Sequence, residues 1–212
     1  MMDIWRSFPA LMLLVISGLM ACGQDQAGSE TTQSGTEPAS IQATFPPPVQ
    51  DSLDRTGWTV REFGNYPIYV AVPKPLVNVS NEVPENAKKF VILNQTYSGV
   101  HGDDLEMIVN IIEYAPGVKV DLDAIAASAE EQMRTDVAVS NFESIRSSKT
   151  ISGASALRQD GRLFRDGLIH YWCNTLVNRG QVVYQVMTIY PETYRLGQGD
   201  VEAMMSSLQL GG

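Results

Sequence analysis

Apolar side chains recur at strand spacing through the chain after residue 51. In residues 66–72 they occupy every second position, which is typical of a strand with one buried face, and Pro67 places it at a sheet edge or a strand start. Four further stretches are predicted as strands: residues 90–97, 105–115, 168–177 and 182–190. The last three are apolar on both sides, which predicts a sheet that is covered on both faces.

Turn residues divide the later strands into hairpins. Asn178-Arg179-Gly180 separates two apolar runs by a short glycine-containing turn. Residues 142–157 and 162–164 are also strand-like. Asp160-Gly161 and Asp166-Gly167 both carry the composition of a hairpin turn, and the sequence leaves open which of them forms it.

Two segments have the spacing of amphipathic helices. Asp121 is the predicted N-cap of the first, and Asp200 is the predicted N-cap of the second, which we expect to end at Gly211-Gly212. The apolar stripes comprise Leu122, Ile125, Ala126, Ala129 and Met133 in the first, and Val201, Met204, Met205 and Leu208 in the second. Strands, a helix, hairpin-linked strands and a final helix predict an α+β fold with a mainly antiparallel sheet.

The amino-terminal segment has a different character. An apolar run covers residues 10–16, which is too short to span a bilayer and fits the core of a secretory signal peptide. The residues that follow it, Leu19-Met20-Ala21-Cys22, resemble the lipobox of bacterial lipoproteins. This resemblance implies that residues 1–21 are a signal peptide and that Cys22 is lipidated and anchors the chain to a membrane.

Residue 23 bears on location. In lipoproteins of cells with two membranes, Asp after the lipidated Cys tends to mark inner-membrane retention, whereas here Gly23 follows Cys22. The resemblance therefore implies the bacterial cell envelope, with the domain facing the periplasm or the exterior. In a cell with two membranes, the outer membrane is favoured over the inner one.

A polar segment follows Cys22. Residues 23–50 are rich in Gln, Ser, Thr, Gly and Pro, contain no Lys or Arg, and show no apolar periodicity. Such a composition does not bury enough surface to offset its ordering entropy. We therefore expect residues 22–50 to form a lipidated, disordered tether and residues 51–212 to form one domain.

Charge and cysteine content exclude some classes of protein. The 212 residues include 24 acidic and 15 basic side chains, for a net charge of −9, and two cysteines. A nucleic-acid-binding protein normally carries a basic surface, so no nucleic-acid partner is expected. Two cysteines do not support a disulfide-built scaffold.

The order of the predicted elements resembles the PsbP-like superfamily. The features shared with that family are an early strand that ends in Val-Pro, at residues 66–73, and a final apolar helix that ends in Ser-Leu, at residues 200–208. The resemblance implies an antiparallel sheet between helices, an α/β/α sandwich. It also implies binding or accessory roles rather than catalysis, and it transfers no catalytic residue.

Few residues carry the signature of a chemical site. Ser155 lacks the second glycine of a nucleophile elbow. His170 and Cys173 fall within an apolar strand, where packing is the expected role. For the basic side chains Arg158, Arg162 and Arg165, a solvated hairpin face is favoured over an anion site.

One polar cluster resembles a metal site. His101, Asp103, Asp104 and Glu106 lie within six residues. The spacing lacks the alternating oxygen ligands of a calcium loop, and a zinc site normally needs more His or Cys ligands. We therefore interpret the cluster as a polar hairpin turn that contains Gly102, and we expect no metal or cofactor.

Two functional hypotheses follow. The first is a membrane-anchored envelope lipoprotein with a non-catalytic domain that binds another envelope protein or assists an assembly. The alternative is a small-ligand binding protein or an unrecognised hydrolase.

Overall fold

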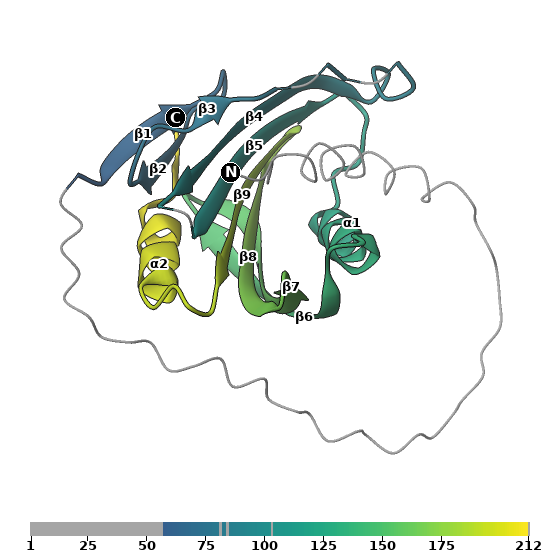
Figure 1. Cartoon of the computed structure of the whole chain (residues 1–212). Coiled ribbons are helices and arrows are strands. Elements are labelled where there is room, and N and C mark those ends of the chain that lie inside the picture. Colours follow the sequence, from purple (N-terminus) through teal and green to yellow (C-terminus); the bar gives the residue numbers. More distant parts are fainter. Residues whose placement is uncertain (1–56, 81, 84, 103, 212) are drawn as a thin grey trace, which may run out of the picture.

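The computed structural model describes residues 57–80, 82, 83, 85–102 and 104–211 (Figure 1). The predicted signal peptide, Cys22, the tether and Asp103 lie outside these residues. Within them, neither helix combines the length and the apolar character that a membrane crossing requires.

Seven antiparallel strands form the main sheet, in the order β3-β4-β5-β9-β8-β7-β6. Its strands are β3 (Val77–Asn78), β4 (Val91–His101), β5 (Leu105–Tyr114), β6 (Ser140–Ile151), β7 (Ala154–Arg165), β8 (Leu168–Arg179) and β9 (Val182–Pro191). All of β9 is buried, and β5 and β8 are buried on both faces over most of their length. The prediction of a mainly antiparallel α+β fold is confirmed.

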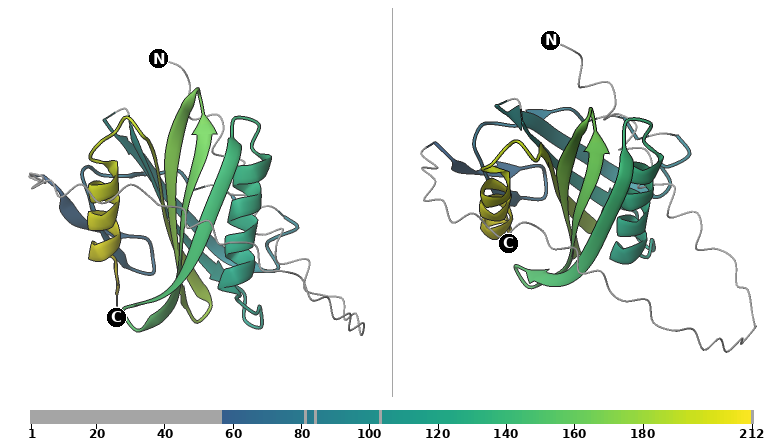
Figure 2. Two further views of the ribbon diagram at one scale, coloured as in Figure 1. Left: turned by 90° about the horizontal axis from the view of Figure 1, so that it is seen from below. Right: turned by 60° about the horizontal axis from the view of Figure 1, so that its bottom comes forward.

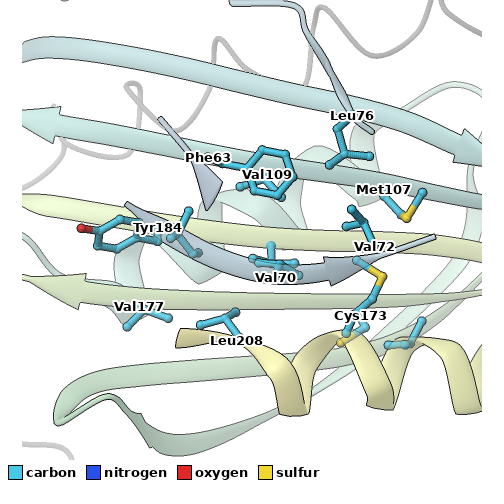
Figure 3. Packing of buried hydrophobic residues seen from close by; sticks show 14 of the residues in the cluster. Phe63, Val70, Val72, Leu76, Met107, Val109, Cys173, Val177, Tyr184 and Leu208 are labelled. Atoms are coloured by element: carbon cyan, nitrogen blue, oxygen red, sulfur yellow. The ribbon is translucent and has the colours of Figure 1, made fainter. Parts of the chain in front are cut away.

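A second, three-stranded sheet joins distant parts of the chain. It consists of β1 (Thr59–Phe63), β2 (Ile68–Val72) and β10 (Gln209–Leu210), in the order β1-β2-β10. The alternation predicted for residues 66–72 is confirmed, because Ile68, Val70 and Val72 are all fully buried. These side chains pack in one cluster with buried residues of β5 and β9 in the main sheet. Figure 3 shows Val70 and Val72 within this cluster.

Helices α1 (Leu122–Thr135) and α2 (Gly197–Ser207) lie on opposite sides of strands β6–β9 (Figure 2). Trp172 of β8 packs in a cluster with Ala129 and Met133 of α1, whereas its neighbour Cys173 packs in the cluster that contains Met204 of α2. The small sheet shares the second cluster with α2. Strands as well as a helix therefore cover that face, which the sequence analysis did not anticipate.

The first helix agrees with its prediction. The Asp121 carboxylate accepts hydrogen bonds from the backbone N–H groups of Asp123 and Ala124, as an N-cap does. Ile125 and the other predicted stripe residues are buried, except for the partly exposed Leu122.

The second helix differs from its prediction at both ends. It begins at Gly197 with Leu196 as the N-cap, so Asp200 lies inside the first turn. It ends at Ser207 with Leu208 as the C-cap, and β10 begins at the next residue, so Gly211-Gly212 does not terminate the helix. The reason is that the last residues pair with β2, which is a contact between distant parts of the chain.

The structure shows which residues form the hairpin turns. Asp166 and Gly167 both have positive φ and connect β7 to β8, whereas Asp160 and Gly161 lie within β7. Ser152 and Gly153 form a similar turn that divides the strand-like residues 142–157 into β6 and β7. The turn predicted between β8 and β9 is confirmed, with Gly180 at φ +67°.

Candidate functional site

The predicted polar cluster lies at the hairpin turn between β4 and β5. Gly102 adopts φ +62° there, and His101 pairs with Leu105 across the turn. The Glu106 carboxylate accepts a hydrogen bond from Arg165 Nη2 at 2.5 Å and is partly buried. Among the described residues, no three His, Cys, Asp or Glu side chains are grouped to hold a metal ion.

The other single candidates lie on strands. Ser155 is exposed on β7. His170 is buried on β8, and its Nδ1 lies 3.2 Å from the Leu168 carbonyl oxygen. Burial lowers the pKa of His170, so the ring is neutral at pH 7. His170 is therefore a packed strand residue, as the sequence predicted.

The three arginines do not form one solvated face. Arg162 is exposed and pairs with Glu143 of β6. The side chains of Arg158 and Arg165, by contrast, are only 14% and 17% exposed. The prediction of a solvated face is wrong for these two, because each reaches a carboxylate on another element, Glu202 of α2 for Arg158 and Glu106 of β5 for Arg165.

A cavity of about 200 Å³ lies between α2 and the β6–β9 side of the main sheet. Side chains at alternate positions of β7 and β8 point to the same face, which brings Arg158, Asp160, Tyr171 and Cys173 together. Helix α2 contributes side chains from the opposite wall. The other lining residues are Ile145, Gly161, Trp172, Tyr190, Gln198, Val201 and Glu202.

Arg158 connects the two walls of this cavity. Its Nε and Nη2 groups donate to Asp160, with Nε 2.9 Å from both carboxylate oxygens and Nη2 2.8 Å from Oδ1. Its Nη1 donates to Glu202 Oε2 at 3.0 Å, and Nη2 also donates to Glu202 Oε1. Burial opposes the charge, but the bonds to Glu202 and Asp160 outweigh it and raise the pKa of Arg158. The guanidinium is therefore paired with two carboxylates within the protein.

The remaining cavity groups are apolar or neutral. Burial raises the pKa of the Cys173 thiol well above its usual value, so this thiol stays protonated at pH 7. The rings of Tyr171 and Tyr190 lie beside each other with centroids 5.4 Å apart. Neither the paired guanidinium nor the protonated thiol is an activated nucleophile. The arrangement is suited to holding a ligand.

A chain of buried polar side chains crosses the opposite face of the sheet. The Asn110 amide donates to Gln185 at 2.8 Å, Gln185 to Asn174 at 3.0 Å, and Asn174 to Gln159 at 2.8 Å. Gln159 donates to Glu130 of α1 at 2.7 Å. This chain ties four strands to a helix, and it has a structural role.

Sequence reasoning missed the residues that define the cavity. Asp160 was interpreted as part of a possible turn, and Glu202, Tyr171 and Tyr190 were not singled out as site residues. A signal was present, because Arg158 and Asp160 are two residues apart and so share one face of a strand. The partner Glu202 lies 44 residues away, and no local pattern predicts that contact.

No known protein-family profile matches the chain, and no curated protein matches it by sequence. The solved structures that resemble it include the following three. Cyanobacterial PsbP (CyanoP) from Synechocystis sp. PCC 6803 has a TM-score of 0.52 at 12% identity, over 79% of this chain and 100% of that chain. LpqN of Mycobacterium tuberculosis, involved in cell envelope biogenesis, has a TM-score of 0.47 at 12% identity, over 68% and 83%.

The third, PA94 of Pseudomonas aeruginosa, a protein of unknown function and putative regulator, has a TM-score of 0.39 at 14% identity, over 63% of this chain and 94% of that chain. The likeness to CyanoP supports the PsbP-like fold expected from the sequence. At 12% identity, that likeness concerns the fold alone.

Proposed function

We propose that this protein is a lipoprotein of the bacterial cell envelope, anchored through Cys22, and that residues 51–212 form a non-catalytic binding domain. The observation that carries the binding role is the cavity beneath α2, whose arginine is paired and whose thiol is protonated. The PsbP-like fold is compatible with such a role. The proposal that the chain is anchored rests on the lipobox resemblance at residues 19–22.

Lipidation of Cys22 is the proposed means of attachment. Each buried methylene contributes about 0.8 kcal/mol, so one acyl chain holds a protein only marginally and two or more hold it durably. A diacylglyceryl group on Cys22 meets this requirement. As a flexible coil, residues 23–50 would separate the domain from the membrane by about 30 Å root-mean-square.

Phase partitioning in Triton X-114 tests the anchor. The wild-type chain, expressed in a bacterium that processes lipoproteins, is expected in the detergent phase. Cys22→Ala removes the lipidated thiol and is expected to block lipoprotein processing. As a control, Cys173→Ala removes the other cysteine, and this variant should partition as the wild type does. Mature wild-type protein in the aqueous phase with a free thiol at residue 22 would contradict the proposal.

The occupant of the binding domain has two candidate classes. A protein partner in the envelope agrees with accessory roles implied by the PsbP-like resemblance. A small ligand is favoured by the cavity itself, because its walls come from four strands and a helix and include both charged and aromatic side chains.

A further inference from the structure

The cavity beneath α2 carries net negative charge although an arginine lies in it. Among the side chains that line the cavity, Asp160 and Glu202 are two carboxylates set against the single guanidinium of Arg158, which leaves one negative charge. Lys149, outside the lining, lies near enough to contribute to the lowered pKa of Glu202. Hydrogen bonds from Arg158 lower the pKa of Glu202, so this side chain is ionised at pH 7. The Glu202 side chain is 51% exposed, so part of its carboxylate is open to solvent and to a ligand.

Arg158 does not make this cavity an anion site. A guanidinium has five N–H donors, and the bonds to Asp160 and Glu202 occupy four of them. An incoming anion would compete with two carboxylates already held in place. It would also approach the side of the site where both carry negative charge, which raises its electrostatic cost.

The rest of the lining suits a cation with an apolar body. Tyr171 and Tyr190 present neighbouring rings, and aromatic faces attract ammonium groups. Ile145 and Val201 add aliphatic surface from β6 and α2. A cavity of about 200 Å³ exceeds the roughly 150 Å³ that accommodates benzene in a protein interior. A ligand of similar or slightly larger size therefore fits.

We propose that the cavity lined by Asp160, Glu202 and the two tyrosine rings binds a small organic ammonium ion. This inference rests on the proposed role of the domain as a binding module and assigns its ligand class. A free ammonium ion is favoured over a phospholipid headgroup, because the phosphodiester of a headgroup would bring a second negative charge beside Glu202.

Isothermal titration with choline tests this assignment. The mature full-length protein is used in a maltoside detergent, which contains no ammonium group. The control ligand is 3,3-dimethylbutan-1-ol, which has the shape of choline without its charge. We expect saturable one-to-one binding of choline and at least about tenfold weaker binding of the neutral isostere. Glycerophosphocholine is expected to bind more weakly than choline.

Two matched variants locate the site. Glu202→Gln makes the ion cluster neutral and should weaken choline binding by about tenfold or more. Glu131→Gln removes the same charge from an exposed position on α1, outside the cavity lining, and should leave choline binding unchanged. Glu202→Gln also weakens the pairing of Arg158, so a modest fall in the melting temperature is expected, and the titrations are made at a temperature where both variants are shown by circular dichroism to be folded.

Three results would overturn the inference. The first is no saturable binding of choline up to about 10 mM, a concentration above the roughly millimolar Kd of a weak specific site. The second is equal binding of choline and of its neutral isostere. The third is unchanged choline binding by the Glu202→Gln variant. Tighter binding of glycerophosphocholine than of choline would overturn the assignment to a free ammonium ion. None of these results depends on phase partitioning, so failure of the ligand and failure of the anchor are distinguishable.

Discussion

Glu130 shows how one residue joins a helix to the sheet. It lies on α1 with a side chain only 7% exposed, and its two carboxylate oxygens accept from Arg146 Nε and Nη2 of β6 at 2.9 and 2.7 Å. Gln159 of β7 donates to the same carboxylate. Burial opposes the charge, but the hydrogen bonds from Arg146 and Gln159 outweigh it and lower the pKa of Glu130 to about 2.

This depressed pKa fixes the pH range in which Glu130 stabilises the fold. Its contribution is complete above the unfolded value near 4.5 and is lost as the pH falls towards 2. We expect Glu130→Gln to lower the free energy of unfolding at pH 7 by about 1–3 kcal/mol, and to flatten the loss of stability between these pH values. Urea unfolding at several pH values measures both. Glu131→Gln, at a 66% exposed side chain, is the control and should change little; equal effects of the two variants would contradict this role.

Residue-scale prediction from sequence succeeded where the partner is local. Asp121 caps α1 through N–H groups two and three positions further on, so the pattern alone identified it. Asp200 has the same residue type before an apolar stripe, yet its carboxylate accepts from Tyr194 Oη at 2.6 Å and the helix starts three residues earlier. A tyrosine six positions away decides the role of that carboxylate, and cap statistics do not include it.

At the scale of elements, the packing of β7 explains why Asp160-Gly161 does not form a hairpin turn. A side-chain Cβ at Gly161 would lie 2.7 Å from the Glu143 backbone oxygen and 3.1 Å from the Trp172 ring. Glycine is therefore needed at 161 mainly because the Glu143 backbone of β6 lies so close, whereas Gly167 is needed for its positive φ. Both requirements select glycine, and a single sequence does not separate them.

Leu208, the C-cap of α2, packs between this helix and both sheets. Leu208 is 5% exposed and packs in the cluster that contains Met204 of α2. Figure 3 shows it with Val70 of β2. Leu208→Ala should lower the free energy of unfolding by about 2–5 kcal/mol, because it leaves a cavity between the helix and both sheets. Val137→Ala, at a fully exposed side chain, serves as the control in the same denaturation experiment. A Leu208→Ala protein as stable as this control would contradict the packing.

For the whole molecule, the sequence predicted the elements better than their assembly. The strands over residues 105–115, 168–177 and 182–190 were recognised because burial on both faces leaves continuous apolar runs. The small sheet was not, because β10 has two residues and gains its place by pairing with β2 about 140 positions earlier. The cavity depends on the same kind of long-range contact, and so its members emerge only from the fold.

Limited proteolysis addresses the proposed division of the chain. Residues 23–50 lack a burial pattern, so we expect the first cuts there and a resistant core that begins near residue 51. The core should then melt in one transition. Strong protection from amide exchange between residues 23 and 43 would contradict a tether.

The mass of the mature amino-terminal peptide from cells tests the lipid anchoring of the domain most directly. An anchored binding domain requires that processing removes residues 1–21 and that Cys22 carries acyl chains. We expect the mature chain to begin at Cys22, with its mass increased by a diacylglyceryl group and, after full processing, by an amide-linked acyl chain. A mature chain that begins elsewhere, or that begins with an unmodified Cys22, would contradict the lipid anchoring.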